Sequence, residues 1–528
     1  MIWRRPAGFL LLVAAALPWG AAESAPAQNG SAWRAGPAQP AGQGRLQGEE
    51  ALVRVYDAIL DARFDEVEAE LQRACGTAPE EACDVLAATA IWWQIVLDPD
   101  SRRLDEEFAT AVERAIRNTE AWSIRAPDNA EAWFYLGGAY AARVQWQVLR
   151  GEKLAAARDG RRIKQALEQA ITLDPALEDA WFGIGMYRYY ADVAPLAARI
   201  LRFLLLLPGG NRDEGLEQML RARDRGRLLE GEADYQLHLI YLWYEDDVPG
   251  ALGLLRGLQQ RYPGNPWFPA RIAEIEDAYL HDLTASLASW RRLLALALER
   301  RVNVAAAAAA RSRLHVAALL DRVHETDRAL DVLAALVRAR PDAPHGALAL
   351  GYLRMAEAQD RLGHRAAALE AYALATATAP VPDVNRVAAR ARRGTRRTPD
   401  PGHAEAYRLS IEGLRLLEHD EGAAAEAALT RAVALNPREP VARYRYGLAL
   451  QAGHNDGAAL EQFELATRDA DACPAPILAN VYLHGARLHE RAGHRDAAIE
   501  WYRAASTVFG VAAETRQAAA RALARLQQ

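Results

Sequence analysis

The sequence has 528 residues, of which 51% are hydrophobic, 25% charged and 8% aromatic, which is typical of a folded globular protein. The net charge of −6 argues against a dedicated nucleic-acid-binding protein, because that function needs a concentrated basic field. Lys153 and Lys164 are the only lysines among 63 basic residues, a bias that we interpret as the mark of a GC-rich, bacterial genome.

The segment 1–22 predicts a secretory signal peptide. Arg4 and Arg5 precede the apolar run Phe9–Leu17, and the small residues Gly20–Ala22 follow, which is the order of a positive region, an apolar core and a cleavage site. The alternative is an uncleaved membrane anchor, but a helix as short as this run rises only about 14 Å and a bilayer core is ~30 Å thick. No cysteine for lipid attachment follows the core, so we expect a periplasmic or secreted protein.

Residues 23–45 are rich in Pro, Ala, Gly and Gln and predict a flexible leader. From about Leu46 onward the apolar residues recur at helical spacing, which predicts an all-α chain. Within the N-terminal helical region, Cys75 and Cys83 flank a Gly-Thr-Ala-Pro turn signal. They form either a disulfide, as an oxidising compartment permits, or two buried free thiols, and the sequence leaves both open.

A period of about 34 residues runs through the C-terminal part of the chain. Gly413 and Gly447 are one such period apart, as are Leu429 and Phe463. We expect each glycine to let two helices approach closely and each large residue to fill the space between them. Pro437 then ends the second helix. Further copies are marked by Gly485 with Trp501, Ala368 with Tyr372, Ala329 with Leu333, and Ala251 with Leu255.

This period and these positions resemble the tetratricopeptide-repeat (TPR) superfamily, over most of residues 126–528. The resemblance implies a right-handed superhelical solenoid of antiparallel helix pairs, whose concave face binds peptides or protein segments. We divide the chain into a signal peptide (1–22), a flexible leader (23–45), an N-terminal helical region (46–125), enlarged aromatic-rich repeats (126–300), further repeats (301–383), an arginine-rich linker (384–403) and C-terminal repeats (404–528).

Two central copies are longer than the period allows. Gly137 opens one of them, yet Leu167 and Pro175 arrive late. The delay is about 14 residues, close to four helical turns, so each helix can gain two turns without rotating its packing face. The next copy contains an inserted apolar segment, residues 193–208. We expect a buried connector or a plug of the groove, and the alternative is a surface helix that contacts a membrane interface.

An interaction surface is predicted in this enlarged middle, because 16 of the 40 aromatic residues lie between Trp122 and Tyr244. The TPR resemblance implies that places 2, 5, 9 and 12 of each copy face the groove. Buried aromatic anchors are each worth about 2 kcal/mol or more at an interface. The alternative is that the curvature of the solenoid or the insertion buries these side chains. The predicted groove residues are Phe134, Phe182, Gln236, Tyr444 and Tyr482 at place 5, and Met186, Tyr189, Ile240 and Trp243 at places 9 and 12.

No motif predicts a catalytic, cofactor or metal site. A zinc-protease helix needs histidines four positions apart, whereas His489 and His494 are five apart and Gly493 ends the helix between them. The arginine cluster in residues 386–397 is interpreted as a solvated linker, with an anionic surface as the alternative partner.

We therefore predict an exported scaffold that binds a partner protein or peptide and is not an enzyme, with cell-envelope assembly or secretion as the natural setting. A different class of function remains open, a helical carrier that binds a lipid or glycan in the aromatic-rich middle. An enzyme with an unrecognised site is the third alternative.

Overall fold

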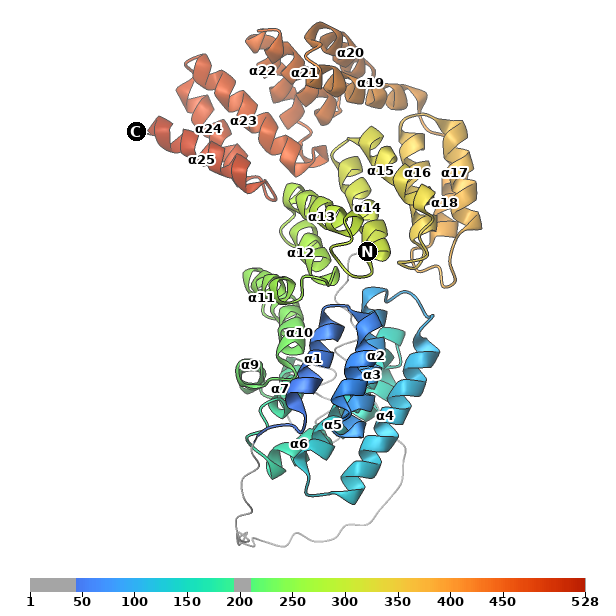
Figure 1. Cartoon of the computed structure of the whole chain (residues 1–528). Coiled ribbons are helices and arrows are strands. Elements are labelled where there is room, and N and C mark those ends of the chain that lie inside the picture. Colours follow the sequence, from blue (N-terminus) through green and yellow to red (C-terminus); the bar gives the residue numbers. More distant parts are fainter. Residues whose placement is uncertain (1–43, 194–209, 528) are drawn as a thin grey trace, which may run out of the picture. The chain divides into compact units, whose positions relative to one another are not determined.

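The computed structural model describes residues 44–193 and 210–527. The predicted signal peptide, the leader up to residue 43 and the predicted insertion beyond Val193 lie outside the described residues. All secondary structure in this part of the chain is helical (Figure 1), which confirms the all-α prediction.

The chain divides into two compact units, residues 1–265 (unit 1) and 266–528 (unit 2). The helices of unit 1 are α1 (Glu49–Leu60), α2 (Phe64–Ala74), α3 (Glu80–Leu97), α4 (Asp105–Arg125), α5 (Ala130–Arg150), α6 (Lys153–Leu173), α7 (Ala180–Val193), α9 (Arg212–Arg225), α10 (Glu230–Trp243) and α11 (Val248–Arg261).

Unit 2 contains a second series of helices. They are α12 (Trp267–Ala278), α13 (Leu283–Leu298), α14 (Ala305–Arg322), α15 (Thr326–Ala339), α16 (Ala347–Arg361), α17 (Arg365–Ala377), α18 (Val387–Arg396), α19 (Pro401–Glu418), α20 (Gly422–Leu435), α21 (Pro440–Ala452), α22 (Asp456–Thr467), the 3-10 turn η2 (Ala470–Ala472), α23 (Ala475–Arg491), α24 (Arg495–Thr507) and α25 (Ala513–Gln527).

Within each unit, consecutive helices pack as antiparallel pairs, such as α5 with α6 and α21 with α22. The glycines of the repeat period lie where the two helices of a pair meet. A Cβ atom would lie 2.3 Å from Cγ of Leu429 at Gly413 and 2.4 Å from Cε1 of Phe463 at Gly447. At Gly485 it would lie 2.1 Å from Cζ3 of Trp501. The predicted steric role of these positions is confirmed.

The enlarged copy also has the predicted form. Helices α5 and α6 have 21 residues each, whereas the regular helices α21 and α24 have 13. Asn129 starts α5, because its side-chain oxygen accepts a hydrogen bond from Glu131 N at 2.8 Å and so satisfies a free amide of the first turn. Gly151 ends α5 with a left-handed φ of 83°, which glycine adopts without strain.

The predicted domain boundaries differ from the structure in two places. The chain is divided into the two units between Asn265 and Pro266, inside the range 126–300 that is predicted as one set of repeats. The predicted linker 384–403 contains helix α18, in which Val387 and Ala391 are buried in a hydrophobic cluster with Tyr372. An open linker is therefore wrong for residues 387–396, because the apolar residues of this arginine-rich segment fall on one face of a helix.

In the described ranges, no helix combines the length and the apolarity that crossing a bilayer requires.

Candidate ligand-binding site

The helix array of unit 1 closes on itself, because α1 contacts α10 and the residues that follow α11. Asn265 donates a hydrogen bond from Nδ2 to the carbonyl oxygen of Leu60 at 2.7 Å. Tyr262 donates from its hydroxyl to Oδ1 of Asp57 at 2.9 Å. These partners are 205 residues apart in sequence. The first helices of successive pairs therefore line an interior space that is partly open to solvent.

The glycine at the second position of α10 permits this closure. A Cβ atom at Gly231 would lie 2.5 Å from Cδ1 of Leu60 and 2.6 Å from the Tyr262 hydroxyl, so a larger residue here would force these two buried side chains to shift.

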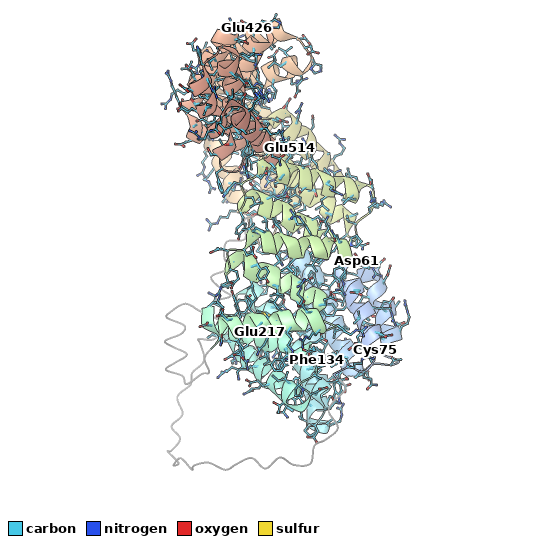
Figure 2. The ribbon with its side chains drawn as sticks, turned by 90° about the vertical axis from the view of Figure 1, so that its left-hand side faces the viewer. Asp61, Cys75, Phe134, Glu217, Glu426 and Glu514 are labelled. Atoms are coloured by element: carbon cyan, nitrogen blue, oxygen red, sulfur yellow. A yellow bond between two sulfur atoms is a disulfide. The ribbon has the colours of Figure 1, made fainter. Side chains whose placement is uncertain are left out.

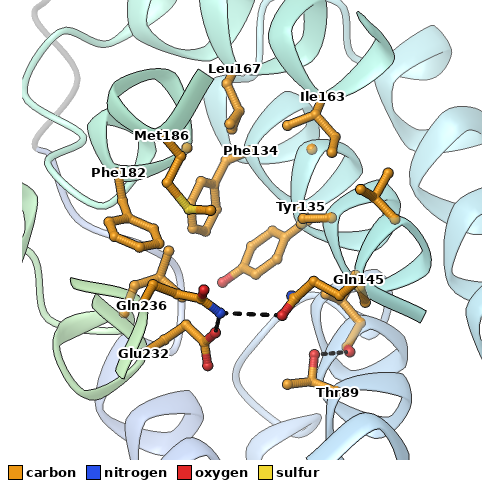
Figure 3. A pocket seen from close by; sticks show the side chains of 18 of the residues that line it. Thr89, Phe134, Tyr135, Gln145, Ile163, Leu167, Phe182, Met186, Glu232 and Gln236 are labelled. Atoms are coloured by element: carbon orange, nitrogen blue, oxygen red, sulfur yellow. Dashed lines mark hydrogen bonds between the residues drawn. The ribbon is translucent and has the colours of Figure 1, made fainter. Parts of the chain in front are cut away.

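A cavity of about 330 Å³ lies inside this ring of helices. Most of its wall is apolar, and Figure 3 shows Phe134, Phe182, Met186, Leu167 and Ile163 around it. Helices α1, α3, α5, α6, α7 and α10 all contribute to the wall. This volume is at the lower end of the range of small-molecule sites, about 300–1,000 Å³.

One part of the wall is polar and centres on Glu232, which is 8% exposed. Its carboxylate accepts hydrogen bonds from the Tyr56 hydroxyl at 3.2 Å and from Trp93 Nε1 at 3.3 Å. Gln236 Nε2 donates to the second oxygen at 2.7 Å and also to Gln145 Oε1 at 3.2 Å (Figure 3). Burial raises the pKa of Glu232, and the three donors oppose that shift.

A second buried carboxylate, Asp179, lines the same cavity and is 4% exposed. It accepts hydrogen bonds from the backbone amides of Leu229 at 2.8 Å and Arg227 at 3.1 Å. Burial raises the pKa of Asp179, and these backbone donors lower it in part.

The hydroxyl of Tyr135 is buried without a hydrogen-bond partner. The residue is 2% exposed, and its hydroxyl points into the cavity (Figure 3). Burial raises the pKa of Tyr135 well above its ordinary value, and the carboxylates of Glu131, Asp179 and Glu49 add to the shift. Buried polar groups in folded proteins are usually paired, so this hydroxyl is a candidate contact for a ligand.

The structure brings four of the nine predicted groove residues together. Phe134, Phe182, Met186 and Gln236 all line the cavity. Gly138 and Ala141, at places 9 and 12 of the Phe134 copy, line it as well, and their small side chains leave its space open. Places that the resemblance assigns to the groove therefore line part of this cavity, which is partly open to solvent.

Three predicted groove residues do not line the cavity and are buried between helices. Tyr189 and Ile240 have no exposed surface and pack with Met219 and Leu237 in a hydrophobic cluster, while Trp243 is 6% exposed. The reason is the packing of α7 and α9 against α10, which covers the faces that carry these side chains. The Tyr189 hydroxyl donates to Glu245.

Tyr444 and Tyr482 lie in unit 2, apart from the cavity, and are half-buried. The Tyr444 ring centroid is 6.1 Å from that of Phe463, and Tyr482 meets Trp501 edge to face at 5.5 Å. These two tyrosines therefore pack against Phe463 and Trp501, the large residues of their repeat copies.

Tyr135 and Glu232 were not predicted from the sequence. They stand at places 6 and 1 of their copies, outside the places that the resemblance assigns to the groove. A buried tyrosine and a buried glutamate leave no sequence signal that distinguishes them from surface residues at helical spacing.

Cys75 and Cys83 form a disulfide, with their Cα atoms 6.1 Å apart. It ties the end of α2 to the first turn of α3 (Cys75 is labelled in Figure 2). Cys473 is a buried free thiol. Among residues 44–193 and 210–527, no three His, Cys, Asp or Glu side chains are grouped as metal ligands.

In sequence, the chain matches no protein-family model and no curated protein. Its structural matches include YrrB, a TPR protein with an unusual peptide-binding site, at 20% identity and a TM-score of 0.20, over 40% of this chain and 90% of that one. The TPR2AB domain of yeast Sti1 in complex with pHSP90 matches at 16% identity and a TM-score of 0.20, over 48% and 97%. A tetratricopeptide repeat protein from Parabacteroides merdae matches at 15% identity and a TM-score of 0.24, over 56% and 99%. At such TM-scores these likenesses carry no argument about ligands, and the fold assignment rests on the helix pairs themselves.

Proposed function

We propose that this chain is a helical-repeat scaffold that holds a partner and does not catalyse a reaction, and that the cavity of unit 1 takes up an apolar group of that partner. The observation that carries this proposal is a mostly apolar cavity of about 330 Å³ inside a ring of packed helices. Protein interiors are normally filled to the density of organic crystals, so an interior space with an aromatic wall favours an occupant.

The volume limits the size of that occupant. At about 30 Å³ for each water-sized group, 330 Å³ holds roughly ten non-hydrogen atoms. A side chain from a partner protein fits, and so does a small aliphatic molecule.

The second candidate is therefore a carrier of a small apolar molecule. The lining of the site favours a carrier, because six helices of one unit contribute to the cavity wall and most of that wall is apolar. Native mass spectrometry of the protein purified from its own cells distinguishes the two candidates, because a carrier retains a bound small molecule and a scaffold retains a partner protein.

Octanol, which has nine non-hydrogen atoms, is the probe for the site itself. In isothermal titration calorimetry we expect saturable binding of one octanol per chain. Ala141→Phe places a ring in the cavity and should weaken binding at least tenfold. Ala69→Phe on the exposed face of α2 is the matched control and should leave binding unchanged. Absence of saturable binding to the unmodified protein would refute the proposed site.

We propose in addition that the protein is exported. Residues 1–22 support export, because a positively charged region precedes an apolar core. The Cys75–Cys83 disulfide also supports it, because such bonds persist in oxidising compartments. N-terminal sequencing of the protein from fractionated cells is the test. A mature chain that begins near residue 23 in the periplasm or medium is expected, and an intact chain confined to the cytosol would contradict export.

A further inference from the structure

The polar part of the cavity wall is acidic. Two carboxyl side chains line it, Asp179 and Glu232, and both are buried. Arg161 is the one basic side chain among the described lining residues, and it is exposed to solvent, where water screens its charge. A buried charge keeps more of its field than an exposed one, so the interior favours a cation.

The unpaired hydroxyl of Tyr135 points into the same space. The charged groups that act on it are the carboxylates of Glu131, Asp179 and Glu49, and no basic side chain is among them. Because the hydroxyl stays protonated, its oxygen can accept a hydrogen bond from a donor on the ligand. The carboxylates around it then stabilise a positive charge on that donor.

The aromatic rings of the wall fit the same ligand. Phe134, Phe182 and Tyr190 line the cavity together with Tyr135. Tyr187 lines it too, but the ammonium of Lys164 already lies 5.5 Å from the centroid of its ring. The face of an aromatic ring attracts an ammonium group by about 0.5–2 kcal/mol, with the larger values where water is excluded. The remaining wall is apolar and suits an aliphatic chain.

We propose that the group held in the cavity is an ammonium at the end of an aliphatic chain, which donates a hydrogen bond to the Tyr135 hydroxyl and faces the Asp179 and Glu232 side of the wall. This inference rests on the proposed function and names the chemistry of its ligand. An anionic head group would meet two buried carboxyl groups with no buried cation to offset them. A purely apolar ligand would leave the Tyr135 hydroxyl unpaired.

Two sources supply this chemistry, a free alkylamine and the lysine side chain of a partner protein. Octylammonium, octanol and octanoate have the same chain length and differ in the charge of the head group. We expect octylammonium to bind the unmodified protein at least tenfold more tightly than octanoate in calorimetry, and more tightly than octanol. A blocked peptide, acetyl-Leu-Lys-Leu-amide, and its norleucine analogue represent the second source.

Tyr135→Phe removes one oxygen atom and keeps the ring. It should weaken octylammonium binding about tenfold, while the melting temperature of the ligand-free protein stays equal or rises, because an unpaired buried hydroxyl is removed. A purely structural hydroxyl would instead lower the melting temperature. The Ala69→Phe control should bind all three ligands as the unmodified protein does.

The outcomes separate this inference from the proposed function. If octanol binds and octylammonium binds no better than octanoate, the ammonium assignment is overturned and the apolar site stands. If none of the three binds, both are overturned. Tighter binding of the lysine peptide than of octylammonium, lost in the norleucine analogue, supports the assignment with a partner lysine as the source. Binding of octylammonium alone supports it with a small amine as the source.

Discussion

Replacing Gly447 by alanine tests the packing on which the repeat array depends. The new Cβ atom would lie 2.4 Å from Cε1 and 2.7 Å from Cδ1 of Phe463. The ring is fully buried, so it has no space into which to rotate. Overpacking of this kind costs about 1–3 kcal/mol, and alanine regains about 1 kcal/mol over glycine through its helix propensity. We expect a net loss of about 0–2 kcal/mol in the free energy of unfolding of the α21–α22 pair.

Gly457 in α22 is the matched control, because a Cβ atom there meets nothing within 4 Å. Gly457→Ala should leave stability unchanged or raise it by up to about 1 kcal/mol. Hydrogen exchange of peptides from α21 and α22, measured by mass spectrometry, reports the local opening free energy within unit 2. Shortening the ring by Phe463→Leu should make Gly447→Ala less costly, so the double variant is more stable than the sum of the single changes predicts. Equal stability of Gly447→Ala and Gly457→Ala would refute the packing described here.

Three further predictions concern pH, the disulfide and the closure of unit 1. Burial, with the charges of Arg445 and Arg361, lowers the pKa of His324 to about 3, although Glu439 lies 3.8 Å away. Because the unfolded chain binds this proton with a pKa near 6.5, acidification from pH 8 to pH 5 should cost unit 2 about 2 kcal/mol through His324 alone. Thermal melts in this range should show a smaller pH dependence for His324→Gln, and an unchanged one would contradict the assignment. Cys75→Ser should destabilise unit 1 by about 2–3 kcal/mol in urea unfolding, and the reduced unmodified protein should match it. Asn265→Ala leaves the Leu60 carbonyl without its partner and should cost about 1–3 kcal/mol, seen as faster hydrogen exchange in α1 with exchange in unit 2 unchanged.

The helix pairs and the contacts between the two helices of a pair could be predicted from the sequence, because the residues involved are close together in the chain. A glycine such as Gly447 and the ring of Phe463 belong to the two helices of one pair, and the steric rule that joins them is carried by the spacing itself. The same reasoning predicted the long helices α5 and α6, since whole turns must be added to keep a packing face in register. The same reasoning did not predict α18, because the many arginines of this segment favoured a solvated linker. Only Val387 and Ala391 mark the helix face that is buried.

The candidate site could be predicted only in part. Phe134, Phe182, Met186 and Gln236 were identified because the first helices of TPR-like pairs face a common side. Tyr189 and Ile240 also stand at places assigned to the groove, yet they do not line the cavity. Sequence spacing assigns a side chain to a helix face, and the packing of neighbouring helices then decides whether that face is covered.

The amino-acid sequence by itself determined that this chain is a series of helix pairs, because helical periodicity and the contacts within each pair span only short stretches of residues. The tertiary structure alone decided that the first unit closes into a ring around an interior space. That closure joins Tyr262 to Asp57 and Asn265 to Leu60 across 205 residues. It depends on small rotations between successive pairs that add up along the array, and no local pattern of residues encodes their sum.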